Sequence, residues 1–273
     1  MIQPGKDLLA AVIAALGLSL PTGAEAVNLA AYRAVYDISL DPATDSGDIA
    51  DLSGRVVAEF SGSQCKGYKA SMRFVLATEN PEGDKQVTDS RTTSFEDSGG
   101  KTLDFANQTY VDDKLTEDSR GKAKRTGEGV AVSLTKPASK QIDLASSVIF
   151  PTQQIEQILA AATTGQAFLA AKIYDGSEDG QKVFSTAVVV GREMTDDGVG
   201  DEPAAAGVKG LRHWPVSVSY FDKDEPGEQK PSYVMSFVLH ENGVQTRLKI
   251  NYGGFGVLAR LNTLNMLPVE ACP

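Results

Sequence analysis

The sequence predicts an all-β protein with one helix, built on a long, curled antiparallel sheet of open, barrel-like shape. Alternating apolar and polar side chains recur along most of the chain, as in strands with one buried and one solvated face. Clusters of Gly, Pro, Asn and Asp separate these runs and predict turns. About a dozen strands in one sheet must curl, split or close to cover their apolar faces.

The first strand shows the alternation clearly, because Tyr36 and Ile38 stand beside Asp37 and Ser39. The Asn-Gly pair at residues 242–243 is a strong hairpin signal, so residues 233–240 and 244–251 should pair directly. The expected strands are residues 32–40, 52–60, 68–78, 87–95, 102–111, 114–125, 129–134, 167–174, 182–191, 214–221, 232–239, 244–252 and 257–267.

One segment has helical rather than alternating spacing. Ile155, Ile158 and Leu159 follow the period of a helix. We expect about three turns, with Thr152 as the N-cap, Gly165 as the stop and no capping box. A second segment, residues 195–210, has no periodicity and predicts a mobile loop.

The N-terminus has the order of a secretory signal. Lys6 precedes an apolar run from Leu8 to Leu20, and residues 24–26 (AEA) form a small-residue cleavage site. The run is shorter than the roughly 20 residues that span a bilayer. We therefore predict a removed signal peptide at residues 1–26 and a single domain at residues 27–273; the alternative is an N-terminal core helix.

Charge and cysteine content bound the environment of the protein. The net charge of −10 disfavours binding to nucleic acid or anionic lipid. The two cysteines, Cys65 and Cys272, allow one intramolecular disulfide, which an exported chain would form in an oxidising compartment. Two free thiols or an intermolecular bond are the alternatives.

Sequence signatures of enzymes are missing. There is no G-x-S-x-G, no phosphate-binding loop, no H-E-x-x-H and no dinucleotide fingerprint. The two histidines, His213 and His240, could meet beside an acid as a catalytic or zinc pair. We predict instead that each is a surface or edge residue, that the protein is not an enzyme, and that it carries no cofactor or metal.

Two charged clusters and the aromatic residues leave alternatives open. Asp196, Asp197, Asp201 and Glu202 could bind calcium, but we predict a solvated acidic loop. The basic cluster of Arg120, Lys122, Lys124 and Arg125 could meet anionic glycan or lipid headgroups, but we predict the exposed face of a strand. The strand aromatics either fill the core, which we expect, or line a cavity for an apolar ligand.

Several short motifs, in their order and spacing, carry a resemblance to a known family. They are residues 32–37 (YRAVYD), 65–68 (CKGY), 150–152 (FPT), 174–178 (YDGSE) and 264–265 (LN) before Cys272. Over essentially all of residues 27–273 the chain resembles the EipB-type cell-envelope integrity proteins of alphaproteobacteria, a conserved domain of unknown function. The resemblance implies a periplasmic β-spiral, a Cys65–Cys272 bridge and a role in envelope integrity. It implies no catalytic residue.

From these observations we expect a non-enzymatic periplasmic protein that binds a partner protein or an amphipathic ligand in the concave face of its sheet. Other envelope proteins, or a lipid or glycan, are the expected partners; nucleic acid and a membrane span are not expected. Two alternatives remain: a lipid or lipoprotein carrier with an apolar cavity, and a hydrolase of an envelope polymer.

Overall fold

The computed structural model describes residues 28–44, 47, 49–222, 230–269 and 271–272. The predicted signal peptide therefore lies outside the described residues. The elements are β1 (Tyr32–Leu40), β2 (Asp51–Ser63), β3 (Gly67–Glu79), β4 (Lys85–Glu96), β5 (Thr102–Val111), β6 (Lys114–Arg125), β7 (Gly129–Lys136), β8 (Lys140–Ala145), β9 (Val148–Ile149), α1 (Pro151–Thr164), β10 (Phe168–Ile173), η1 (Glu178–Gly180), β11 (Phe184–Val190), η2 (Pro203–Val208), β12 (His213–Phe221), β13 (Tyr233–His240), β14 (Gln245–Asn251) and β15 (Gly256–Met266).

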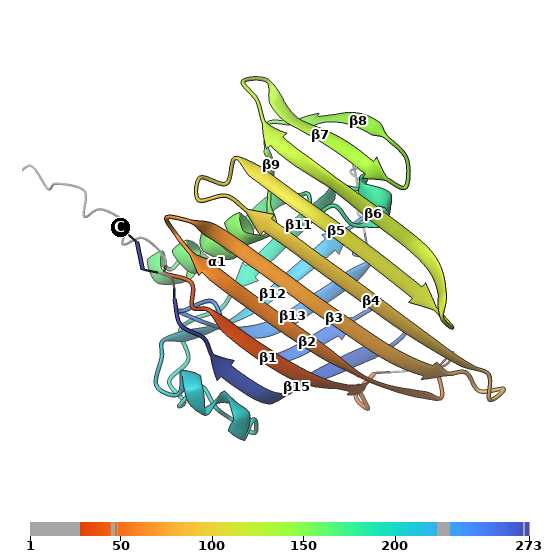
Figure 1. The fold of residues 1–273 in the computed structure, drawn as a ribbon. Helices are drawn as coiled ribbons and strands as arrows, with labels where there is room; N and C mark the ends of the chain where they lie inside the picture. Colours follow the sequence, from red (N-terminus) through yellow and green to blue (C-terminus); the bar gives the residue numbers. More distant parts are fainter. Residues whose placement is uncertain (1–27, 45–46, 48, 223–229, 270, 273) are drawn as a thin grey trace, which may run out of the picture.

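All of these strands join one 15-stranded sheet in the order β8-β7-β6-β5-β4-β3-β2-β1-β15-β14-β13-β12-β11-β10-β9. Neighbouring strands are antiparallel except β9 and β10, which are parallel. The sheet curls so that β1–β6 form the front layer of Figure 1 and β11–β13 lie behind them. The predicted all-β class and curled, barrel-like sheet are confirmed, as is the pairing of β13 with β14.

The helix packs between the two layers of the curled sheet (Figure 1). Its buried Ile158 and Leu159 belong to one apolar cluster with Trp214 of β12 and Val188 of β11 in the rear layer. The same cluster includes Tyr68 of β3 in the front layer. Burial on both sides holds the helix inside the curl, where it fills the end of the barrel near the start of β1.

The predicted start of the helix is wrong. The N-cap is Phe150, and Pro151 occupies the first helical position, where its missing N–H costs nothing. Thr152 does not cap; its own N–H donates to Glu96 Oε1 of β4 at 2.7 Å. The Gln153 side chain accepts from Phe150 N at 3.2 Å. This is the contact from the third helical residue back to the N-cap that a capping box contains, and it was not predicted because the helix was expected to start at Thr152. The predicted stop at Gly165 is confirmed by its left-handed φ of 77°.

Contacts across the two ends of the sheet bring it close to a closed barrel. Residues 174–181, which include η1, pack on β6 and β7. The side chains of Asn107 and Ser119 both donate to Gly176 O at 2.8 Å. A Cβ on Gly176 would lie 2.2 Å from the ring of Phe105, so only glycine permits this approach.

Arg125 makes a second set of contacts between the two ends of the sheet, which we call the seam. Its guanidinium donates to Val148 O at 2.9 Å, to Gln153 Oε1 at 2.8 Å and to Gly100 O at 2.9 Å. These bonds join β6 to β9, to the first turn of α1 and to the β4–β5 turn. Arg125 is half-buried, so the prediction that it is an exposed strand residue is wrong.

The prediction of a mobile loop at residues 195–210 is wrong over η2. Ala205 and Val208 of this 3₁₀ helix are fully buried against β1 and β15. Glu202 is also buried and accepts backbone N–H groups from Arg247 at 2.9 Å and Leu261 at 2.8 Å. Both donors lie beside breaks in the strand register, which leave N–H groups without a partner in the ladder.

The two cysteines are joined in the structure. Cys65 lies in the turn between β2 and β3, and Cys272 follows β15. Their Cα atoms are 5.7 Å apart, within the usual range for a disulfide. The bond fastens the end of the chain across β1 to the β2–β3 turn.

Candidate functional site

The concave face of the front layer is partly open to solvent. One row of side chains runs across it from Tyr36 of β1 through Val56, Phe74 and Ser90 to Thr109 of β5. Tyr36 is buried, but the other four are only half-buried. In a filled barrel this row would be buried throughout. The interior beyond the helix is therefore accessible over β2–β5.

The next row repeats the pattern. Ala34 of β1 is fully buried, and Met72 of β3, on the same face, is 43% exposed. The lining also changes in chemistry from strand to strand. Apolar side chains dominate on β2 and β3, whereas the central inward positions of β4 are Thr88, Ser90 and Thr92. The accessible surface is thus amphipathic.

The rear layer presents five aromatic rings at the end of the barrel away from α1. We call Phe184, Tyr220, Tyr233, Tyr252 and Phe255 the aromatic ladder. Successive ring centroids are 6.0, 4.5, 5.8 and 4.9 Å apart. Tyr220 is two residues along β12 from Val218, which contacts the core cluster around α1, so the ladder lies on the concave face.

The ladder is only partly covered. Tyr252 is 44% exposed, and Tyr220 and Tyr233 are half-buried. Burial, aided by the charge of Asp175, raises the pKa of Tyr220 to about 12. Burial raises the pKa of Tyr233 far above its usual range, with Tyr220 and Asp175 adding to the effect. The hydroxyls stay neutral at any physiological pH, so the ladder offers aromatic faces and neutral hydrogen-bonding groups.

The two histidines meet in space. His213 at the start of β12 pairs in register with His240 at the end of β13, and their rings stack with centroids 5.2 Å apart. Both are at least 98% buried. The prediction that each is a surface or edge residue is wrong, and an acid does stand beside them: His213 Nε2 lies 2.8 Å from Asp196 Oδ1.

The pair nevertheless has the contacts of a structural cluster. His213 Nδ1 lies 2.7 Å from Leu211 O, so both ring nitrogens face acceptors and both donate only in the doubly protonated ring. Burial, then the charges of His213 and Arg247, lower the pKa of His240 to about 4. Gly198 passes over the rings, and a Cβ there would lie 2.9 Å from His240. No substrate can reach rings covered in this way.

The acidic cluster is not one exposed group. Glu202 is buried and satisfies backbone N–H groups, so its predicted solvation is wrong. Asp196 binds His213 and lies 3.3 Å from Arg247, and its pKa is lowered to about 2, mainly by the N–H of Gly198 and by His213. Asp196, Asp197 and Asp201 are all exposed, as predicted. Among the described residues there is no group of three or more His, Cys, Asp or Glu that could hold a metal ion.

The remaining sequence candidates divide between the two faces of the sheet. Arg120, Lys122 and Lys124 are exposed on the convex face, as predicted for a strand. Among the aromatic residues, Phe105 and Phe237 are buried core, as expected, whereas Tyr252 of the ladder is 44% exposed. Sequence reasoning missed the ladder, and it named the meeting of the two histidines only as the less favoured alternative. One signal could have found both. In antiparallel neighbours the end of one strand meets the start of the next, which brings Tyr220 to Tyr233 and His213 to His240.

These features define a class: a barrel-like β-protein closed around one helix, with a partly open concave face. The chain belongs to the EipB-like family, whose sequence profile matches residues 23–268. This confirms the resemblance seen in the motifs. The chain is 38% identical over 247 residues to the cell envelope integrity protein EipB of Brucella abortus (strain 2308). The match covers 90% of this chain and 87% of the Brucella protein.

A solved structure supports the same assignment. The crystal structure of a β-barrel-like protein of a domain of unknown function from Brucella abortus is 37% identical to this chain. The two superpose with a TM-score of 0.81, over 89% of this chain and all of the other. Among the described residues, no helix is of sufficient length and apolarity to cross a bilayer.

Proposed function

We propose that this chain is a periplasmic, non-enzymatic protein that maintains the cell envelope by holding an amphipathic molecule, or an amphipathic part of a partner protein, in its concave interior. The single observation that carries the proposal is the accessible interior, in which the aromatic ladder lies on the rear layer and a mixed apolar and hydroxyl surface lies on β2–β4. The name of the Brucella relative supports the envelope role.

The periplasmic location is supported by two independent features. Residues 1–26 have the order of an export signal. The Cys65–Cys272 bond belongs to an oxidising compartment, because the bacterial cytosol keeps thiols reduced.

The lining favours an amphipathic ligand over the acyl chains of a lipid carrier. Thr88, Ser90 and Thr92 present hydroxyl groups inward along the whole middle of β4. The Ser90 hydroxyl already bonds to Thr109 Oγ1 at 3.0 Å. A wholly apolar chain would still cover the hydroxyls of Thr88 and Thr92 without offering them a hydrogen bond, which costs free energy. The hydrolase alternative has no support at the histidine pair, because both rings are covered.

The interior is tested by titration with N-phenyl-1-naphthylamine, a neutral dye that fluoresces in apolar surroundings. We expect saturable binding that Met72→Ser or Tyr252→Ser weakens at least about fivefold, because each removes apolar contact area. Val189→Ser is the matched control, since Val189 is 55% exposed on the opposite face. A sugar-headed amphiphile, dodecyl maltoside, should displace the dye. Equal binding by all variants would refute the proposal, and one diacyl lipid per chain in mass spectra of the native protein would favour the carrier.

A further inference from the structure

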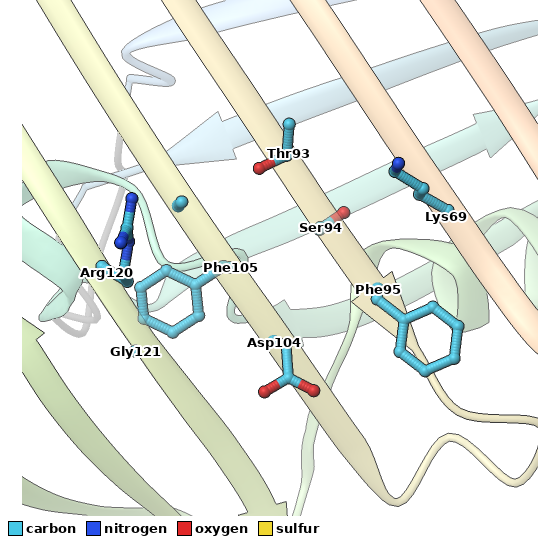
Figure 2. A pocket seen from close by; sticks show the side chains of 9 residues that line it. Lys69, Thr93, Ser94, Phe95, Asp104, Phe105, Arg120 and Gly121 are labelled. Carbon is cyan, nitrogen blue, oxygen red and sulfur yellow. The ribbon is translucent and has the colours of Figure 1, made fainter.

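The convex face of β3–β6 holds a pocket that lies on the other side of the sheet from the proposed interior site. Its volume is about 330 Å³, within the range of small-ligand sites. Figure 2 shows its side chains on the strands of the front layer: Lys69, Thr93, Phe95, Asp104 and Arg120. The pocket exists because the convex position between Thr93 and Arg120 is the small Ala106, which leaves a hollow in the surface.

The aromatic ring in this pocket is unusually open. Phe95 is 39% exposed, and its neighbours around the pocket on this face are mostly polar. Lys69 and Asp104 stand directly beside it in register on the two neighbouring strands. The ring offers a flat apolar surface, while Thr93 and Asp104 offer oxygen atoms that accept hydrogen bonds.

The charges around the pocket are unbalanced. Asp104 is paired with Lys122 at 3.0 Å, whereas among the described residues neither Lys69 nor Arg120 pairs with a carboxylate. The single carboxylate of Asp89 forms ion pairs with both Arg73 and Arg91, at 2.9 and 2.7 Å. Within β3–β6, the charged convex side chains around the pocket are six cations and three anions: Lys69, Arg73, Arg91, Arg120, Lys122 and Lys124 against Asp89, Asp104 and Asp118. Glu59 on the neighbouring strand β2 is one further anion. This patch is positive on a chain whose net charge is −10.

We propose that this pocket binds a saccharide bearing a carboxylate group, with a sugar ring stacked on Phe95 and the anionic group held by Lys69 and Arg120. A sugar combines the three features that the lining requires. The C–H bonds on one side of its ring match the face of Phe95, its hydroxyls donate to Asp104 and Thr93, and its carboxylate pairs with Lys69 and Arg120. Such a contact would attach the protein to an acidic envelope glycan while the interior stays free.

The test uses the full mature chain and oligogalacturonate as the probe, with binding followed by calorimetry at low and physiological salt. Affinity should fall about tenfold or more in Lys69→Gln/Arg120→Gln and in Phe95→Ala. The charge-matched control is Lys85→Gln/Lys114→Gln, which removes two exposed cations away from the pocket and should change affinity less than twofold. Uncharged malto-oligosaccharide should bind at least tenfold more weakly.

Three results would overturn the proposal. They are no binding of oligogalacturonate, binding that the pocket variants leave unchanged, and equal affinity for the neutral saccharide. A separate arm with vesicles of phosphatidylcholine and phosphatidylglycerol distinguishes lipid headgroups as the source of the anion. If the vesicles bind through Lys69 and Arg120 and the saccharide does not bind, the pocket binds phospholipid headgroups and the proposal is wrong. Dye binding in the interior should be unchanged in Phe95→Ala, which separates this site from the proposed function.

Discussion

At the scale of single residues, buried and half-buried charged groups hold the irregular parts of the sheet. Glu202 accepts two backbone N–H groups beside register breaks, and Arg125 donates to the carbonyl oxygens of Gly100 and Val148 and to the side-chain oxygen of Gln153. A sequence shows the residue type but not the partner, because these contacts join positions far apart in the chain. For this reason both residues were predicted to be ordinary solvated charges.

The histidine pair predicts a pH dependence of stability. The pKa of His240 is about 4 in the folded state, below the ordinary value of 6.5 that it has when unfolded. Protons therefore bind the unfolded state first, and stability is lost as pH falls from 6.5 towards 4. His213, Arg247 and Asp196 are the charged groups that act on it, and Thr246 Oγ1 lies 3.0 Å from its Nε2.

Between pH 7.5 and pH 4.5 this group should remove about 2 kcal/mol from the free energy of unfolding. Urea titrations at the two pH values measure it, with His240→Gln as the comparison because glutamine does not titrate. The variant should lose about 2 kcal/mol less than the wild type over the same interval. Parallel losses in the two proteins would show that His240 is not the titrating group.

At the scale of elements, regular strands were predictable and short or covered elements were not. The alternation of β1 and the Asn-Gly turn between β13 and β14 specify local structure, and both predictions are confirmed. The strands β8 and β9 were missed because β8 has only Ile142 and Leu144 as apolar residues and β9 is two residues long. The start of α1 was misplaced because Glu96, from another strand, takes the N–H of Thr152.

The contact of β6 with α1 and β9 predicts the effect of Arg125. Replacing Arg125 by Met leaves the carbonyls of Gly100 and Val148 without their donor, which should lower the free energy of unfolding by about 2–4 kcal/mol. Lys124→Met is the matched control, because it removes the same charge from the exposed face and should cost less than about 0.5 kcal/mol. Urea denaturation of the two variants measures the difference; equal stabilities would show that these contacts do not hold the seam.

At the scale of the whole molecule, a single cross-link joins two segments 207 residues apart in sequence. Constraint of so long a loop in the unfolded chain predicts a loss of about 2–5 kcal/mol of stability in Cys65→Ser/Cys272→Ser or in the reduced protein. Melting with and without reductant measures it. The double variant should not respond to reductant, and a wild-type melting temperature that reductant leaves unchanged would refute the prediction.

The overall shape followed from the sequence more readily than the site did. One sheet of this many half-solvated strands has to curl, and the curl is observed. Whether its interior is filled depends on how far α1 reaches and on which inward side chains oppose one another. Met72 and Tyr252 look like core residues in the sequence, yet both are more than 40% exposed, so the described part of the opposite layer does not cover them.

A complementation assay tests whether the open interior performs the envelope role. Thr88→Trp places a large ring on the concave face, and Val87→Trp places the same ring on the convex face one residue away. In cells lacking this gene, survival in a membrane-active detergent is measured with each variant exported at wild-type level. If the open interior is needed, Val87→Trp should restore resistance and Thr88→Trp should not. Full protection by Thr88→Trp, or unaltered resistance when the gene is absent, would contradict it.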